Sequence, residues 1–211
     1  MRKITLYASY VLAMGVALYA VVAYGLFPLG DLVHPLMKKV FQQHAAVIYI
    51  HVFCSALALA LGPLQFSGWL RQNHIRIHRW LGRVYLTIGV LPGSISGLYI
   101  AQFAFGGWLS HSGFSLLACA WMFTGVMAYL AIRRKDIVRH QQWMIGNYAL
   151  TFAAVTLRIY LGLFMAAEVR FEVFYAWLAW LCWLPNVLVA LWLARKVTTP
   201  NNHICMQAQS V

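Results

Sequence analysis

The sequence has very few acidic residues and little charge of either sign. Only four of its 211 residues are Asp or Glu, and charged residues make up 9% of the chain. A soluble domain carries roughly 25% charged residues, so this chain has too little polar material to cover a surface that faces water. Its hydrophobic residues, 63% of the total, suit a surface that faces lipid instead. The composition therefore predicts an integral membrane protein with the lipid bilayer as its main partner.

Two further classes are excluded by what the sequence lacks. The net charge of +12 is not spread along one face, because Lys and Arg occur in short clusters between apolar stretches. Such clusters are typical of loops beside anionic lipid headgroups, so we expect no nucleic-acid partner. No C-x-x-C spacing occurs among Cys54, Cys119, Cys182 and Cys205. The first three lie in apolar runs, where we interpret them as small buried hydrophobes.

Six apolar stretches are long enough to cross a membrane, which takes ~20 mostly apolar residues. They cover roughly 4–29, 45–67, 80–105, 111–132, 143–167 and 173–194. The first stretch follows Arg2 and Lys3 as a signal peptide would, but it is longer than a signal core of roughly 7–15 residues. We therefore expect a retained helix. The predicted fold class is an all-α membrane bundle, with residues 1–197 as a single transmembrane domain and 198–211 as a polar cytoplasmic tail.

Basic residues are distributed unequally between the two sides of these spans. Twelve Lys and Arg residues fall on the side that holds both termini, and three fall on the other, Lys38, Lys39 and Arg170. Because cytoplasmic loops are enriched in Lys and Arg, both termini are predicted to be cytoplasmic.

The middle four spans contain a short internal similarity. Residues 76–85 are R-I-H-R-W-L-G-R-V-Y, and residues 139–148 are R-H-Q-Q-W-M-I-G-N-Y. The segments 45–105 and 111–167 are thus expected to be two repeated helical hairpins, related by a two-fold axis along the membrane normal, that form a four-helix core. Gly82 and Gly146 are expected to allow close helix contact at the corners.

Four histidines occupy corresponding places in these hairpins. His51 and His111 lie near the outer ends of the second and fourth spans, and His78 and His140 lie near the inner ends of the third and fifth. Two imidazoles that face each other across a bundle can ligate a haem iron, so we expect each pair to hold one b haem. The alternative is that these histidines are interfacial. The inner pair is shallow, because 27 residues follow from His78 to the end of its span, ~40 Å of helix, unless Pro92-Gly93 breaks or tilts that helix.

Arg158 lies within the fifth span, whereas no Asp or Glu lies within any span. Burying a guanidinium in the bilayer costs at least ~2.5 kcal/mol and calls for a partner in the bundle interior. Haem propionates, a quinone-like headgroup or an anionic substrate would supply that partner. The alternative is that Arg158 reaches outward to the interface, or bonds to backbone carbonyls and water.

The segments H-V-F-C-S-A-L-A-L-A-L-G-P-L-Q-F, H-R-W-L-G-R-V-Y and H-Q-Q-W-M-I-G-N-Y-A-L-T-F-A-A-V-T-L-R resemble the bacterial predicted-membrane-protein family known as domain of unknown function 2306. The resemblance covers roughly residues 45–165 and implies a multipass protein, here of the bacterial cytoplasmic (inner) membrane. A second, architectural resemblance is to the cytochrome b561 family, which has six helices. In that family, histidines of the second and fourth helices hold one b haem, and those of the third and fifth hold the other. The chain lacks a local motif that is diagnostic of that family.

The leading functional hypothesis is a di-haem b electron-transfer protein. Such a protein would act as a transmembrane oxidoreductase of the cytochrome b type. His51 and His111 would hold the outer haem, with Arg158 on its propionate, and His78 and His140 would hold the inner haem, with Arg83 near its propionates. A quinone or a small redox protein would exchange electrons with it, and a homo-oligomer is compatible with the sequence. The alternatives are a non-enzymatic membrane assembly factor and a small transporter that binds an anionic substrate at Arg158.

Overall fold

The computed structural model describes residues 3–197 as a bundle of helices, with no strand in that range. Six helical stretches are long and apolar enough to cross a membrane, and they are Tyr7–Leu26, Ala45–Gln65, Ile75–Ala101, Gly107–Arg133, Ile137–Ala166 and Phe171–Ala194. The all-α fold class and the six predicted spans are confirmed. The expected tail 198–211, with Cys205, lies outside the described residues.

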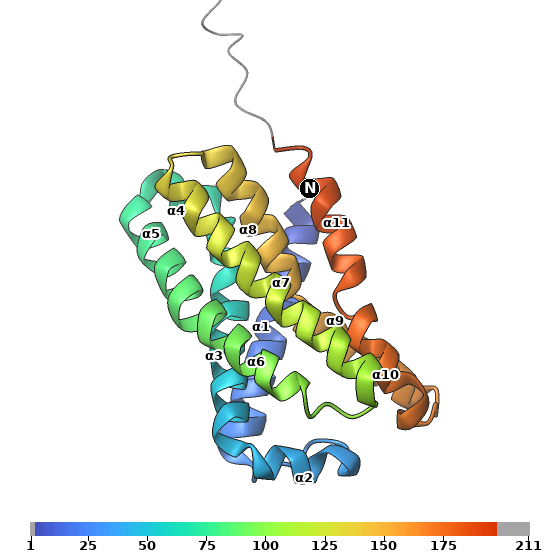
Figure 1. Cartoon of the computed structure of the whole chain (residues 1–211). Helices are drawn as coiled ribbons and strands as arrows, with labels where there is room; N and C mark the ends of the chain where they lie inside the picture. Colours follow the sequence, from blue (N-terminus) through green and yellow to red (C-terminus); the bar gives the residue numbers. More distant parts are fainter. Residues whose placement is uncertain (1–2, 198–211) are drawn as a thin grey trace, which may run out of the picture.

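Three spans are single helices and three are composite (Figure 1). The single ones are α1 (Lys3–Leu26), α3 (Ala45–Gln65) and α7 (Gly107–Arg133). The third span joins α5 (Ile75–Val84), the π-helical η1 (Tyr85–Val90) and α6 (Leu91–Ala101); the fifth joins α8 (Ile137–Thr151) and α9 (Ala153–Ala166); the sixth joins α10 (Phe171–Leu181) and α11 (Leu184–Ala194). Two short helices, α2 (Pro35–Gln43) and α4 (Gly68–Asn73), lie at opposite ends of the bundle.

The composite third span differs from the expected helix in two ways. It begins at Ile75 rather than near residue 80, so His78 is part of its first turn. Its irregularity precedes Pro92-Gly93 and takes the form of η1, in which the N–H of Leu91 bonds to the carbonyl of Leu86, five residues back. Proline has no N–H to give the helix, and the π-helical segment lies directly before it. The helix then continues to Ala101, so the span is not broken there. At 27 residues, ~40 Å of ideal helix, it is longer than a ~30 Å hydrocarbon core, and tilting accommodates such an excess.

The middle four spans pack side by side in chain order. Helix α3 contacts η1 and α6, α6 contacts α7, and α7 contacts α8. The first and sixth spans flank these four: α1 packs on α3 and α9, and the sixth span packs on α7, α8 and α9. Small residues allow the first of these flanking contacts: Ala13, Ala17 and Ala20 of α1 are buried in one cluster with Ala56 of α3 and Val155 of α9. The expected two-fold repeat of the two hairpins is not confirmed by this packing and stays a prediction.

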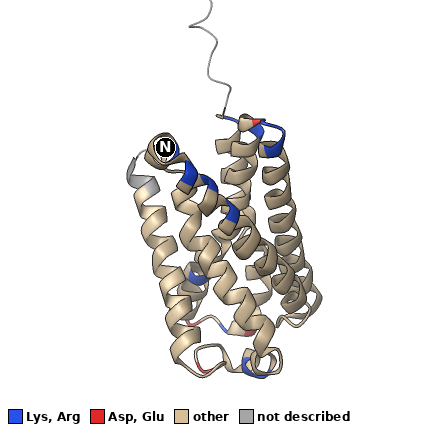
Figure 2. Ribbon diagram, turned by 90° about the vertical axis from the view of Figure 1, so that its left-hand side faces the viewer, with Lys and Arg blue, Asp and Glu red and all other residues tan. Residues whose placement is uncertain are grey.

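Charged residues lie mainly toward the two ends of the bundle (Figure 2). We call one of them the basic end; it includes α4, α5, the turn between α7 and α8, and the end of α11. Its Lys and Arg residues are Arg71, Arg76, Arg79, Arg83, Arg133, Arg134, Lys135, Arg139, Arg195 and Lys196. We call the other end, which carries Lys38, Lys39 and Arg170, the α2 end.

A buried polar network joins the third and fifth spans to α7. The hydroxyl of Tyr85 on η1 donates to Oδ1 of Asn147 at 2.6 Å and lies 2.9 Å from Oγ1 of Thr151, both on α8. Asn147 donates to the carbonyl of Trp121 and to Oγ1 of Thr124, both on α7, at 2.7 and 2.9 Å. The indole N–H of Trp121 donates to Oγ1 of Thr151 at 2.8 Å. These bonds fix three spans to one another around the π-helical segment.

Candidate functional site

A cavity of about 390 Å³ lies inside the bundle, in the half nearer the α2 end. Its walls come from α3, α6, α7 and α9, and most of the side chains that line it are apolar or aromatic. Trp121 and Thr151 of the polar network also line it. Ligand pockets typically measure roughly 300–1,000 Å³ and combine apolar walls with a few polar groups, so both size and lining suit a small amphipathic ligand.

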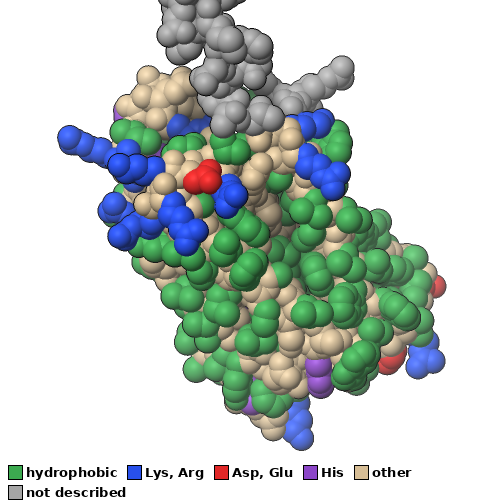
Figure 3. All heavy atoms as spheres, turned by 45° about the horizontal axis from the view of Figure 1, so that its top comes forward, with side chains coloured by type: hydrophobic (Ala, Val, Ile, Leu, Met, Phe, Trp, Pro, Cys, Tyr) green, Lys and Arg blue, Asp and Glu red, His purple; other side chains and the backbone are tan. Residues whose placement is uncertain are grey.

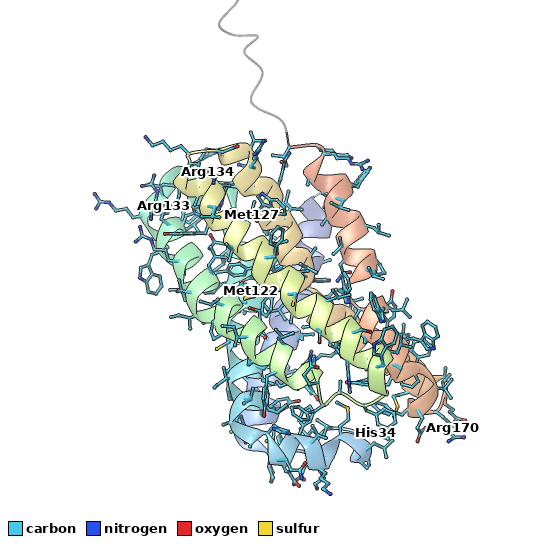
Figure 4. The ribbon with its side chains drawn as sticks, viewed as in Figure 1. His34, Met122, Met127, Arg133, Arg134 and Arg170 are labelled. Atoms are coloured by element: carbon cyan, nitrogen blue, oxygen red, sulfur yellow. The ribbon has the colours of Figure 1, made fainter. Side chains whose placement is uncertain are left out.

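Helix α2 covers part of this cavity with Leu36, Met37, Val40 and Phe41. Pro35 begins the helix, and Nδ1 of His34 accepts a hydrogen bond from the N–H of Leu36 at 3.4 Å. The imidazole of His34 stacks on Phe171 at the start of α10, with ring centroids 3.9 Å apart. Figure 4 shows His34 and Arg170 at the α2 end of the bundle. Helix α2 was not predicted from the sequence, although its proline start and its apolar pairs one turn apart are typical of a short amphipathic helix.

His51 lines the cavity from α3, with its two ring nitrogens in different surroundings. Its Nδ1 lies 2.8 Å from the carbonyl of Gly93 on α6. The ring rests against Gly97, where an added Cβ would lie 2.9 Å from Cε1. The described residues give Nε2 no hydrogen bond, and one turn along α3 the hydroxyl of Ser55 is buried without a partner at the same cavity. His51 was predicted from the sequence as a site residue, and Ser55 was not.

Arg158 lines the same cavity from α9 and is half-buried. Its guanidinium donates to the carbonyl of Ala154 at 2.9 Å and lies over the ring of Tyr19 at 5.7 Å. Among the described residues no carboxylate pairs with it, because the ion pairs there are Lys38–Asp31, Arg139–Asp136 and Arg170–Glu172. Arg158 therefore bonds to a backbone carbonyl, as one of the two sequence interpretations expects. It also lines a cavity in which a ligand could pair with it, as the other interpretation requires.

His111 is not a wall of this cavity. Its Nε2 lies 2.9 Å from the carbonyl of Ala104, in the turn between α6 and α7. On α7 it lies about one turn from Phe114 and two turns from Ala118, which do line the cavity, as Ala104 does. The structure thus brings His51 and Arg158 to one cavity and places His111 one turn beyond it.

His78 and His140 lie at the basic end, on α5 and α8. They are close enough for their charges to interact. Nδ1 of His140 lies 2.9 Å from the carbonyl of Ala128 on α7, whereas Nδ1 of His78 is buried and has no hydrogen-bond partner among the described residues. Arg83 is exposed on α5. No group of three or more His, Cys, Asp or Glu that would hold a metal ion occurs within residues 3–197; a haem with two axial histidines needs no such group.

These contacts define what the cavity can bind. The apolar walls suit the body of a ligand. Three polar groups are available to its polar end, which could accept an electron pair or a hydrogen bond from them: Nε2 of His51, the hydroxyl of Ser55 and the guanidinium of Arg158. Metal-ligating histidines usually give their other ring N–H to a backbone carbonyl or carboxylate. His51 and His140 both have that arrangement.

The chain matches a known protein family. The family model described as "Predicted membrane protein (DUF2306)" matches residues 48–194, a range that contains His51, His78, His111, His140 and Arg158. Neither a curated protein nor a solved structure matches the chain. Since the match covers more than half of the sequence, the chain belongs to the DUF2306 family of predicted membrane proteins.

Proposed function

We propose that the cavity binds a b-type haem and that the protein moves electrons across the membrane. One observation carries the proposal: the imidazole of His51 is held by the carbonyl of Gly93 at a largely apolar cavity, and the same cavity is lined by Arg158, which has no carboxylate partner among the described residues. A haem has the same division into an apolar face, an iron that binds imidazole, and anionic propionates.

The residues of the cavity fit such a group on the His51 side. Nε2 of His51 would ligate the iron, and the guanidinium of Arg158 would pair with a propionate in place of its contact with Ala154. The bound haem would supply the redox chemistry, and the apolar walls would exclude water from it. His111 contacts the carbonyl of Ala104 through Nε2 and lies one turn beyond the cavity, so its ring would have to turn toward the cavity to serve as the opposite ligand.

The second haem of the proposal belongs at the basic end. His140 would present Nε2 while the carbonyl of Ala128 holds its Nδ1. His78, whose buried Nδ1 has no partner within residues 3–197, would face it from α5. Arg83 and its basic neighbours would then meet the propionates or an electron donor. Two sites, one toward each end of the bundle, would make a path for electrons through the membrane.

The test is a visible spectrum of protein purified in detergent from cells supplied with ample haem precursor. Reduced-minus-oxidised spectra should show a b-type band. His51→Ala and His140→Ala should each remove one component, and His74→Ala, an exposed basic-end histidine outside both sites, should remove neither. Colourless wild-type protein, or a band untouched by His51→Ala, would refute the proposal.

A second candidate function is the binding or transport of a small amphipathic anion. It is favoured by Arg158, which lines the cavity without a carboxylate partner among residues 3–197. Arg158→Gln separates the two candidates. If the cavity takes an anion, this variant loses binding and the wild type has no chromophore; if the cavity takes haem, the variant keeps the band, and its reduction potential shifts.

A further inference from the structure

A groove of about 530 Å³ opens between α7, α8 and α11 in the half of the bundle nearer the basic end. Met127 and Leu130 of α7 face Val187 and Leu191 of α11 across it, and Trp183 lies toward its deep end. Its surface is apolar over most of its length. The groove is separate from the histidine cavity, which lies in the other half of the bundle, although Leu150 borders both.

The open end of the groove is basic. Arg134, Arg139 and Arg195 line it there together with a single acid, Asp136. Asp136 is already engaged, because one carboxylate oxygen lies 3.4 Å from Nε of Arg139 and the other accepts the N–H of Arg139 at 3.0 Å. Arg134 and Arg195 are exposed and have no ion pair within residues 3–197.

The figures show the same division of charge and apolar surface. In Figure 3, Lys and Arg side chains gather at the basic end around an acidic one, and hydrophobic side chains cover the surface beyond them. Figure 4 shows Arg134 at the end of α7, with Met127 further along the same helix.

The length of the groove matches one leaflet of a bilayer. Along α8, Arg139 and Leu150 are eleven residues apart, and along the sixth span, Trp183 and Arg195 are twelve residues apart. At 1.5 Å per residue these separations are about 16 and 18 Å, against about 15 Å for half of a hydrocarbon core. A molecule with its anionic group among the arginines would therefore extend its apolar part to about the middle of the membrane.

Gly146 keeps this groove open. A Cβ added at Gly146 would meet nothing within 4 Å, so the expectation that this glycine allows close helix contact is wrong. Helix α8 meets α11 and the residues after it on either side of Gly146 instead. The side-chain amide of Gln142 donates to the carbonyls of Ala194 and Val197, both at 3.3 Å. The side-chain amide of Asn186 donates to the carbonyl of Ala149, also at 3.3 Å.

We propose that this groove binds an anionic phospholipid of the leaflet at the basic end. Its phosphate lies between Arg134 and Arg195, and an acyl chain lies along Met127 and Val187 toward Trp183. Charge selects the headgroup, because a zwitterionic lipid offers no net negative charge to two unpaired guanidinium groups. Basic pockets between transmembrane helices bind anionic headgroups for the same reason.

Native mass spectrometry of the detergent-solubilised protein tests the proposal with phosphatidylglycerol and phosphatidylcholine of the same chain length. Phosphatidylglycerol should be retained preferentially. Each neutralised arginine should weaken its binding about fivefold, so Arg134→Gln/Arg195→Gln should weaken it about 25-fold. Arg76→Gln/Arg79→Gln, which removes the same charge from exposed positions of α5, should leave it within about twofold.

Two further measurements test the apolar part of the site. Gly146→Leu fills the groove without removing charge and should displace the lipid, while a thermal-unfolding scan verifies that the variant is folded. Glycerol phosphate, which has the anionic group but no acyl chain, should not compete. Equal retention of both lipids, equal effects of the two double variants, or full competition by glycerol phosphate would each overturn the proposal.

Discussion

Replacing Thr151 by Val tests whether the buried polar network holds the third and fifth spans to α7. The two side chains have nearly the same shape, but valine removes the three hydrogen-bonding contacts that Oγ1 makes with Trp121, Tyr85 and the carbonyl of Asn147. Interhelical hydrogen bonds in membrane proteins average about 0.6 kcal/mol, so the two contacts that reach other helices, with Trp121 and Tyr85, amount to about 1 kcal/mol. The indole N–H of Trp121 would also be left buried without an acceptor. We therefore expect Thr151→Val to lower the free energy of unfolding by more than about 1 kcal/mol.

The matched control is Thr151→Ser, which keeps the hydroxyl and removes one methyl group, at a cost of under about 1 kcal/mol. Both variants are to be unfolded in mixed micelles by a titration with sodium dodecyl sulfate, with tryptophan fluorescence as the signal. Because Tyr85 keeps its bond to Asn147 in both, the difference reports the contacts of Oγ1. If Thr151→Val were no less stable than Thr151→Ser, the network would not hold α7, α8 and η1 together.

Three other predictions concern the groove, the histidine cavity and the orientation of the chain. Gly146→Ala should raise the free energy of unfolding by about 0.5–1 kcal/mol, because the added Cβ meets nothing within 4 Å and alanine favours helix; the same titration measures it, and a loss of stability would contradict the open groove. Gly97→Val should displace the imidazole of His51, which lies 2.9 Å from an added Cβ, so it should remove the same haem component as His51→Ala; an unchanged spectrum would refute that link. In a cysteine-free background, Asn73→Cys at the basic end should react with an impermeant maleimide only in opened cells, and Lys39→Cys at the α2 end should react in intact ones; the reverse pattern would contradict the predicted orientation.

The membrane spans could be predicted because each depends on a property of a contiguous segment. A run of about twenty apolar residues such as 45–65 must form its own hydrogen bonds in lipid, and a helix does so without help from the rest of the chain. Helix α2 was missed because its nine residues are too few to cross a membrane. Its apolar face packs over a cavity formed by other helices, and that cavity cannot be recognised in the sequence. The π-helical segment was missed because the residues that hold it come from α7 and α8, far along the sequence.

The candidate site was predictable in part for the same reason. A single ionisable residue within a span, such as Arg158, is costly wherever the helix lies, so it is visible in the sequence as a functional candidate. The groups that surround such a residue in the folded protein cannot be read from the sequence. Whether His51 faces His111 depends on helix rotation and on the turn that brings the carbonyl of Ala104 to His111, and no local pattern contains either.

The sequence by itself determined that this chain is a six-span helical membrane protein with one basic end, because hydrophobicity and charge act segment by segment. Only the tertiary structure decided that His51 and Arg158 share a cavity, that α2 covers it, and that three arginines from different segments line one groove. Those arrangements depend on the packing of side chains between helices, which sets how each helix is rotated about its axis and what its polar residues meet.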